Sequence, residues 1–146
     1  MKIKFLNVYN EEELFQIIKL EKNIFSSSHF TAKDIYSFTE NKYINIVCCL
    51  EGDEVIAYLI FSDNVDCFEI LRIACKQEFQ RKGAATLLLR EMFKLKKDIF
   101  LEVRKSNEKA INFYRKNSFN YISTRKNYYF DGEDALIFKR DGGTDE

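Results

Sequence analysis

Histidine is nearly absent from this 146-residue sequence, which contains His29 alone. The sequence therefore lacks the several histidines that a His-based zinc site needs, and it offers only one histidine for a Ser-His-Asp triad. The four cysteines are Cys48, Cys49, Cys67 and Cys75. They form no Cys-x-x-Cys pair, and three of the four fall in apolar, strand-like runs. We expect buried thiols in place of disulfides or zinc ligands, and no metal cofactor.

Net charge and long apolar runs are lacking too. The 23 Lys and Arg residues are matched by 23 Asp and Glu residues, so no global field attracts nucleic acid or an acidic membrane. No apolar run approaches the ~20 residues that cross a bilayer, and Met1–Phe5 lacks the core of a signal peptide. These features predict a cytoplasmic protein with local recognition and no direct nucleic-acid or membrane partner.

The sequence has enough apolar residues for a hydrophobic core, since 46% of the residues are apolar and 14 are Phe. A chain of this length is expected to form a single domain, which we place at residues 1–140. The final segment, 141–146, is rich in Gly and acidic residues and is expected to be a disordered tail.

Apolar periodicity predicts strands and helices that alternate only in the middle of the chain. Capping signatures at Asn10 with Glu13, and at Thr31 with Asp34, predict two helix starts, and Ser26–Ser28 breaks the first helix. Further helices are expected from about Gly83 and over 108–117. The expected strands are 2–6, 43–50, 55–61, 68–74, 99–104, 119–123 and 135–139, the second and third forming a hairpin.

The segment Gln80-Arg81-Lys82-Gly83-Ala84-Ala85 lies between a predicted buried strand and a leucine-rich helix. Helix starts leave N–H groups unpaired and carry the positive end of the helix dipole, so an anion can bind there. Small side chains at 83–85 would let a phosphate approach the backbone, and two basic residues add charge. The alternative is an ordinary strand-to-helix turn with exposed basic residues.

The order of motifs resembles the GNAT N-acetyltransferases over nearly the whole chain. The motifs are Gln80 to Ala85, Leu101-Glu102-Val103-Arg104-x-x-Asn107, and Ala110-x-x-x-Tyr114-x-x-x-x-Phe119. More narrowly, Leu101 to Asn107, Arg125-Lys126-Asn127-Tyr128-Tyr129 and Glu133-Asp134-Ala135 resemble the RimI family, which acetylates the N-terminal alanine of a small-subunit ribosomal protein. The resemblance implies an α/β (α+β) GNAT fold: a mixed, mostly antiparallel twisted sheet of about six to seven strands with about four helices.

The resemblance implies acetyl-CoA as the donor and a protein or peptide N-terminus as the acceptor. The donor's pantetheine arm would pair with the backbone of Ile73, Ala74 and Cys75, and its diphosphate would bind Arg81, Lys82, Gly83, Ala84, Ala85 and Thr86. Asn107 would hold the arm near the thioester, although it could equally be only a helix cap. A ping-pong route through Cys75 is less favoured than a buried thiol, because no His or Lys obviously lowers its pKa.

Family precedent implies Glu102 as general base and Tyr114 as general acid. A free α-amine has a pKa near 8, so roughly a tenth is neutral at pH 7 and a modest carboxylate base suffices. The alternatives are a strand carboxylate paired with Arg104 and a core aromatic, respectively. Two other functions stay open: acetylation of a small-molecule amine, and noncatalytic acyl-CoA binding, for which neither Glu102 nor Tyr114 would be needed.

Two positions depart from the family pattern. Asn117-Ser118 replaces the glycine that usually ends the helix, and the cap is expected to shift to Asn117, because Asn tolerates a left-handed turn better than Ser. The loop Phe25–Ser28 lacks the Pro-Trp that RimI relatives commonly carry near the acceptor site. Tyr128 and Tyr129 are candidates for shaping the peptide entry, or else only pack a hairpin.

Overall fold

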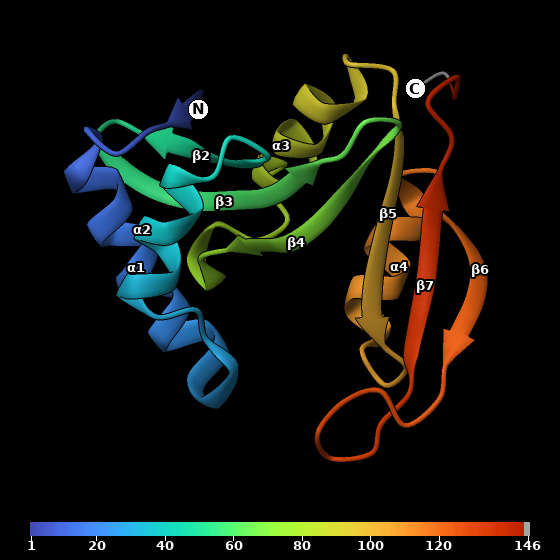
Figure 1. The fold of residues 1–146 in the computed structure, drawn as a ribbon. Coiled ribbons are helices and arrows are strands. Elements are labelled where there is room, and N and C mark those ends of the chain that lie inside the picture. Colours follow the sequence, from blue (N-terminus) through green and yellow to red (C-terminus); the bar gives the residue numbers. More distant parts are fainter. Residues whose placement is uncertain (145–146) are drawn as a thin grey trace. The chain divides into compact units, whose positions relative to one another are not determined.

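The computed structural model describes residues 1–144 as a seven-stranded mixed sheet with four α-helices. The strand order is β1-β2-β3-β4-β5-β7-β6, in which β4 and β5 are parallel (Figure 1). The strands are β1 (Lys2–Leu6), β2 (Ile44–Glu51), β3 (Glu54–Asp63), β4 (Cys67–Cys75), β5 (Asp98–Arg104), β6 (Asn120–Arg125) and β7 (Ala135–Arg140). The helices are α1 (Glu11–Phe25), α2 (Ala32–Glu40), α3 (Ala84–Phe93) and α4 (Glu108–Lys116). The expected fold class is confirmed.

The chain, which the sequence predicts to be one domain over 1–140, divides into two compact units. The first unit comprises Met1–Asp63 and Leu71–Glu91, and the second comprises Asn64–Ile70 and the chain from Met92 onward. Strand β4 contributes residues to both units, and each unit is described by itself below.

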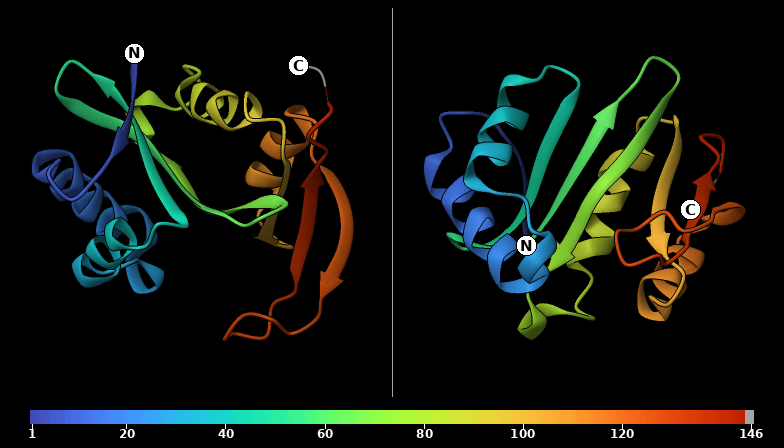
Figure 2. Two further views of the ribbon diagram at one scale, coloured as in Figure 1. Left: turned by 45° about the horizontal axis from the view of Figure 1, so that its top comes forward. Right: turned by 60° about the horizontal axis from the view of Figure 1, so that its bottom comes forward.

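In the first unit, α1 and α2 pack on one face of β2 and β3, and α3 lies on the other face (Figure 2). Both strands are almost wholly buried, which explains why they are continuous apolar runs. The hairpin between them turns at Gly52, whose φ of 60° is accessible to glycine without strain. Helix α2 begins at the expected capping box, in which Thr31 and Asp34 bond to each other's backbone N–H.

The capping box predicted at Asn10 and Glu13 is wrong. The Asn10 side chain accepts a hydrogen bond from the Asn7 N–H at 2.8 Å, so it stabilises the preceding turn and does not cap α1. The Glu13 carboxylate instead pairs with Lys4 at 2.6 Å. Asn side chains often close such local turns, and here the turn prevails over the cap.

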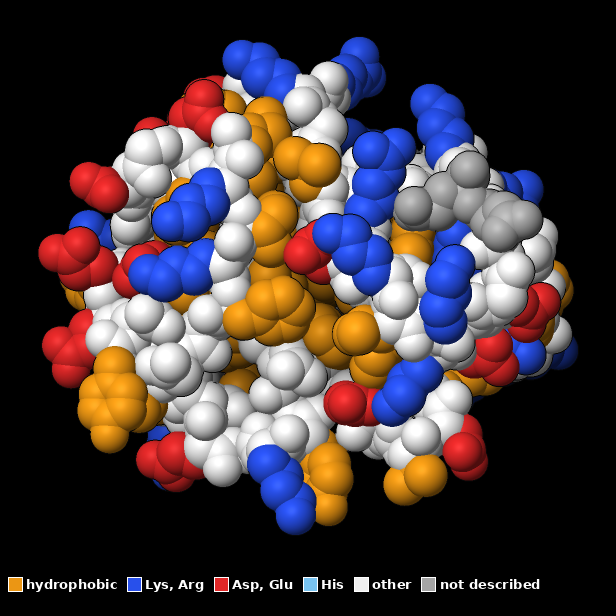
Figure 3. Space-filling view, turned by 90° about the horizontal axis from the view of Figure 1, so that it is seen from above, with side chains coloured by type: hydrophobic (Ala, Val, Ile, Leu, Met, Phe, Trp, Pro, Cys, Tyr) orange, Lys and Arg blue, Asp and Glu red, His pale blue; other side chains and the backbone are white. Residues whose placement is uncertain are grey.

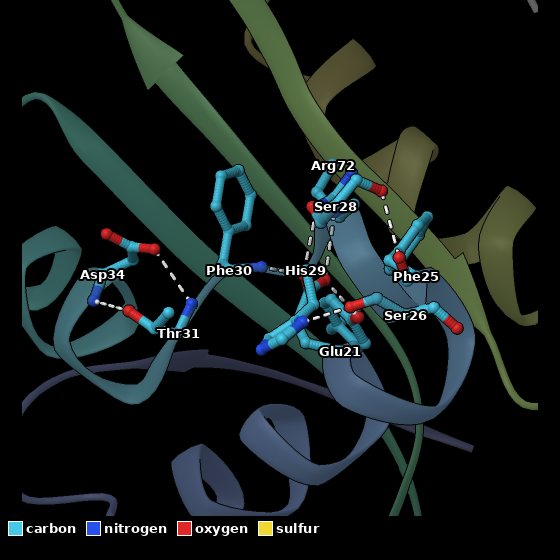
Figure 4. A network of polar contacts seen from close by, with 10 residues as sticks. Glu21, Phe25, Ser26, Ser28, His29, Phe30, Thr31, Asp34 and Arg72 are labelled. Carbon is cyan, nitrogen blue, oxygen red and sulfur yellow. Dashed lines mark hydrogen bonds and ion pairs between the residues drawn. The ribbon is translucent and has the colours of Figure 1, made fainter. Parts of the chain in front are cut away.

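A buried polar cluster joins α1, β3 and β4 within the first unit (Figure 4). Glu21 has no solvent exposure, and Arg72 donates to both of its carboxylate oxygens at 3.0 Å. The Tyr58 hydroxyl and the Phe30 N–H also donate to this carboxylate. Arg72 further donates to the Ser28 carbonyl, and its guanidinium contacts the Phe25 and Phe30 rings at 3.8 and 4.4 Å from their centroids. The cluster therefore fixes the 25–30 segment to β4.

In the second unit, β7 pairs with both β5 and β6, and α4 follows β5 in the chain. Along β5, Ile99, Leu101 and Val103 are buried while the intervening residues are partly exposed, the alternation expected of the strand predicted over 99–104. The cap after α4 does not shift to Asn117: Ser118 itself adopts φ 69°, while Asn117 has φ −100° and donates its side-chain amide to the Phe113 carbonyl. That hydrogen bond keeps Asn117 in the helical turn and leaves the left-handed position to Ser118.

The predicted tail begins at Asp141, and its first residues have defined contacts. The Gly142 N–H donates to Asp98 at 2.8 Å, and a Cβ at Gly142 would meet the Lys96 carbonyl oxygen at 2.4 Å. Gly142 thus packs too closely for any side chain. Residues 145 and 146 of the predicted tail lie outside the described residues.

Candidate active site

The predicted donor-binding residues of the first unit follow one another along the end of β4, a short loop and the start of α3. Ile73, Ala74 and Cys75 end β4, a 3₁₀ turn covers Gln77–Phe79, and α3 starts at Ala84. The Gln80 side chain donates to the Cys75 carbonyl at 3.5 Å, which ties the loop back to the strand. Arg81, Lys82 and Gly83 are exposed, while Ala84 is buried against the core.

The backbone at this helix start fits an anion. Gly83 has φ +89° and its carbonyl accepts the first α3 hydrogen bond, from Leu87 N–H at 2.9 Å. No atom lies within 4 Å of the position a Gly83 Cβ would take, so the space beside the loop is open. The helix itself does not use the N–H groups of its first turn, which include those of Ala84, Ala85 and Thr86. These features are compatible with the predicted diphosphate site, which stays a prediction.

The β4–β5 ladder is short. Its pairs run from Cys67 opposite Asp98 to Ile70 opposite Leu101. The part of β4 that belongs to the first unit, from Leu71 to Cys75, continues beyond the last of these pairs. Backbone groups of Ile73 to Cys75 on that edge are therefore not used by this ladder and suit a strand-like ligand.

Glu102 lies in the second unit at a hollow of about 260 Å³. The Tyr128 hydroxyl donates to its Oε1 at 3.2 Å, and Arg125 Nε lies 3.1 Å from its Oε2. Oε2 is inaccessible to solvent and has no hydrogen bond, so the Arg125 contact is an ion pair without hydrogen-bond geometry. The hollow is lined by Glu69, Phe100, Leu101, Glu102, Ile122, Ser123, Arg125 and Ile137.

The alternative pairing of Glu102 with Arg104 is wrong. Arg104 donates instead to Asp131 and Glu133, at 2.9 Å to the nearer oxygen of each carboxylate, and these bonds raise the pKa of Arg104. Glu133 also accepts from the Ser106 N–H, and its pKa is lowered by its bonds to Ser106 and Arg104. This part of the RimI-like motif therefore anchors the loop before β7 and leaves Glu102 to other partners.

Tyr114 and Asn107 both belong to α4. Tyr114 is 7% exposed, its ring packs against Phe113 and Phe119, and burial raises the pKa of its hydroxyl. Tyr114 thus packs as a core aromatic, the alternative given above to a role as general acid, and its hydroxyl stays protonated. Asn107 caps α4 by accepting the Ala110 N–H at 3.2 Å, which is the alternative role that the sequence allowed for it.

Tyr128 and Tyr129 form an edge-to-face pair with ring centroids 5.2 Å apart. The Glu102 carboxylate raises the pKa of Tyr128, and burial raises that of Tyr129, which also contacts the Arg104 guanidinium at 4.1 Å from its ring centroid. Hairpin packing is therefore part of their role, while the Tyr128 hydroxyl additionally reaches Glu102.

Sequence reasoning missed two residues of the hollow as site residues, Glu69 and Arg125. The signal for Glu69 was a single carboxylate inside the otherwise apolar run from Phe68 to Leu71. Arg125 had no comparable signal, because its contact with Glu102 depends on how β6 and β7 pair.

The cysteines are thiols, of which Cys48 and Cys49 are buried and Cys67 and Cys75 half-buried. The Cys75 thiol donates to the Lys76 carbonyl at 3.5 Å. Across residues 1–144, no group of three or more His, Cys, Asp or Glu side chains is arranged to hold a metal ion. Within the same residues, no helix combines the length and apolar character needed to span a bilayer.

Comparison with known proteins places the chain in a family. The model of the acetyltransferase (GNAT) family matches residues 11–119. A Bacillus subtilis protein named as a [ribosomal protein bS18]-alanine N-acetyltransferase is 30% identical over 132 residues, which cover 86% of this chain and 87% of that protein. The Escherichia coli ribosomal-protein-S18-alanine N-acetyltransferase structure is 25% identical and superposes with a TM-score of 0.84 over 99% of this chain and 96% of that one.

An N-alpha-acetyltransferase of Saccharolobus solfataricus is 43% identical over 77 residues, which cover 49% of this chain and 46% of that protein. The chain therefore spans about half the length of such archaeal relatives. The family match, the full-length resemblance to the Bacillus protein and the shared fold agree: the chain belongs to the GNAT acetyltransferase family.

Proposed function

We propose that this protein transfers the acetyl group of acetyl-CoA directly to the N-terminal α-amino group of a protein, most specifically of a ribosomal protein, as the RimI-type enzymes do. The Bacillus and Escherichia relatives are named for ribosomal S18 proteins, and the archaeal relative is named as an N-alpha-acetyltransferase. A ribosomal acceptor is consistent with work in the cytoplasm.

Most of the residues proposed to hold acetyl-CoA belong to the first unit, and Asn107 belongs to the second. The diphosphate would bind the N–H groups at the start of α3, with Arg81 and Lys82 adding charge, and the pantetheine arm would pair along Ile73 to Cys75. Asn107 uses its Oδ1 as the α4 cap, so its side-chain nitrogen would contact the arm. When bound, the donor supplies an acetyl thioester, which an amine can attack without a covalent enzyme intermediate.

The observation that carries the proposal is the placement of Glu102. Its carboxylate lies at a hollow, with Oε1 oriented by Tyr128 and Oε2 unused by any hydrogen bond. An α-amine has a pKa near 8, so removal of its proton by a carboxylate, directly or through water, is a modest task at neutral pH. A lysine side chain, with a pKa near 10.4, would be far harder to deprotonate.

Tyr114 would protonate the departing thiolate. A phenol is protonated over the physiological pH range, so the proton is present when the thiolate forms. Burial raises the pKa of Tyr114, which makes its hydroxyl a weaker acid than a free phenol. The oxyanion of the tetrahedral intermediate needs a hydrogen-bond donor as well, and backbone N–H groups at the end of β4 are suited to that task.

The test compares acceptors at saturating acetyl-CoA by following thiol release. A peptide with a free N-terminal Ala is expected to react, and the same peptide with a blocked N-terminus to be inert. A panel of polyamines and amino sugars should react much more slowly. Faster turnover of a small amine would replace the proposed acceptor, whereas donor binding without turnover of any amine would indicate a noncatalytic module.

A further inference from the structure

Arg125, at the end of β6, covers the one oxygen of Glu102 that no hydrogen bond occupies. Its Nε lies 3.1 Å from Oε2, and that oxygen has no solvent exposure. The Arg125 side chain itself is 58% exposed, and its guanidinium lies 5.4 Å from the centroid of the Tyr128 ring. The carboxylate therefore faces the hollow with a guanidinium over its free oxygen.

Glu102 does not need Arg125 to keep its position. The residue lies within β5, which pairs with β7 from Ile99 to Arg104, and the Tyr128 hydroxyl orients Oε1. Arg125 is held by an ion pair without hydrogen-bond geometry and by a distant contact over the Tyr128 ring, and most of its own side chain is exposed to water. The arginine side chain can therefore move away while the carboxylate stays in place.

We propose that Arg125 caps Glu102 in the free protein and is displaced by the ammonium form of the acceptor amine, so that it sets the affinity for the acceptor. This inference rests on the proposed function. At pH 7 about nine-tenths of an α-amine with a pKa near 8 is protonated, so the arriving group is a cation that competes with the guanidinium for the same oxygen.

The charge of the hollow supports the exchange. It contains two carboxylates, Glu69 and Glu102, and one guanidinium. Once Arg125 leaves, two negative charges face the incoming group, which favours a cation. The substrate class is accordingly a primary amine that carries its charge at the reacting end, without a carboxylate beside it.

The experiment uses Arg125→Gln, with Lys126→Gln as matched control. Lys126 is the exposed neighbouring residue, so both variants remove one positive charge from the same strand end. With the free N-terminal Ala peptide, Arg125→Gln is expected to lower the acceptor KM about two- to fivefold, the range for losing an exposed ion pair. The acetyl-CoA KM should not change, the control should match wild type, and Arg125→Lys should restore most of the wild-type KM.

A second measurement does not depend on activity. The rate at which a carbodiimide and an amine nucleophile label Glu102, followed by peptide mass spectrometry, reports whether its oxygen is covered. Glu102 should be labelled severalfold faster in Arg125→Gln than in the wild type or in Lys126→Gln.

Unchanged labelling of Glu102, or an acceptor KM that stays the same or rises in Arg125→Gln, would overturn the inference while leaving the proposed function intact. If wild type acetylates no amine, the proposed function fails instead, and the labelling rate alone decides whether Arg125 caps Glu102.

Discussion

Glu102 and Tyr114 illustrate how two residues of one unit acquire different environments. Glu102 is partly exposed and lies among charged and hydroxyl groups, whereas Tyr114 is packed among aromatic rings. Glu102 lies at a hollow, as a base that meets a substrate must. Tyr114 keeps its proton, as an acid must, although burial raises its pKa and weakens it as a donor.

Replacing Tyr114 with Phe tests the acid role. The change removes only the hydroxyl and leaves the contacts with Phe113 and Phe119, so the fold should persist. We expect turnover to fall by about 10²-fold or more, with a much smaller change in the acetyl-CoA KM. Tyr121→Phe, which removes an exposed hydroxyl bonded to Thr124, is the control. Unchanged turnover in Tyr114→Phe would show that another group protonates the thiolate.

At the scale of elements, the loop between β4 and α3 is open to solvent, whereas the cluster around Glu21 is buried and hydrogen-bonded. The loop ends in Gly83, which has open space beside it, and Arg81 and Lys82 before it are exposed, as a site for an anionic ligand requires. The cluster has four donors on one buried carboxylate and joins α1 and β3 to β4. The first is expected to govern donor binding, and the second the stability of the first unit.

Gly83→Ala tests the loop. An added Cβ meets no atom, but a residue with a side chain at φ +89° is strained, so we expect a loss of about 1–2 kcal/mol in unfolding free energy. Because the new methyl group would also obstruct the diphosphate, calorimetry should show at least tenfold weaker acetyl-CoA binding. Gly132→Ala is matched to it, with φ +88° and the same open surroundings, and lies in the second unit. If both variants bind acetyl-CoA equally well, the Gly83→Ala substitution causes only backbone strain, and Gly83 is not part of the donor site.

Arg72→Met tests the cluster. The variant leaves the Glu21 carboxylate buried without its counter-charge, which typically costs about 3–5 kcal/mol of unfolding free energy. Urea unfolding would measure the loss. Tyr58→Phe removes one hydrogen bond to the same carboxylate and should cost about 1.5–3 kcal/mol. Lys4→Met, which breaks the partly exposed pair with Glu13, should have a far smaller effect. Similar values for all three variants would contradict the special role of the buried pair.

For the whole molecule, the positive and negative side chains balance in number, and the titration of its carboxylates determines how stability depends on pH. Lys and Arg side chains are interspersed with Asp and Glu on the face shown in Figure 3, as expected for a chain with 23 residues of each sign. Hydrogen bonds and ion pairs lower the pKa of Glu13, Asp34, Asp98, Asp131 and Glu133. The stability that these carboxylates contribute is present above the ordinary carboxyl pKa near 4 and is lost as the pH falls below it.

Alkaline pH should destabilise the protein through its buried thiol. Burial raises the pKa of Cys48 from 9.0 to about 12. Above pH 9 the unfolded chain releases this proton while the folded chain keeps it, so stability declines from pH 9 and continues to decline up to about pH 12. Melting temperatures across this range should fall, and the decline should be shallower in Cys48→Ala. An equal decline in both proteins would show that other groups, such as the buried tyrosines, dominate.

Local sequence patterns predicted the elements well where a side chain had only one possible hydrogen-bond or packing partner. The hairpin at Gly52, the capping box at Thr31 and the alternation of Ile99 to Val103 all appear as expected. The prediction at Asn10 was wrong because its side chain had two possible N–H partners, and the preceding turn won. The pairing of Glu102 with Arg104 was wrong because Asp131 and Glu133, 27 and 29 residues away, are the nearer partners.

The family and the order of elements could be predicted from residue types at short, regular spacings. The groups around the proposed base could not be predicted in this way. Tyr128 and Arg125 reach Glu102 from 26 and 23 positions away in the chain, since β6 and β7 fold back beside β5. Contacts at such separations depend on strand pairing and register, which a local pattern does not encode.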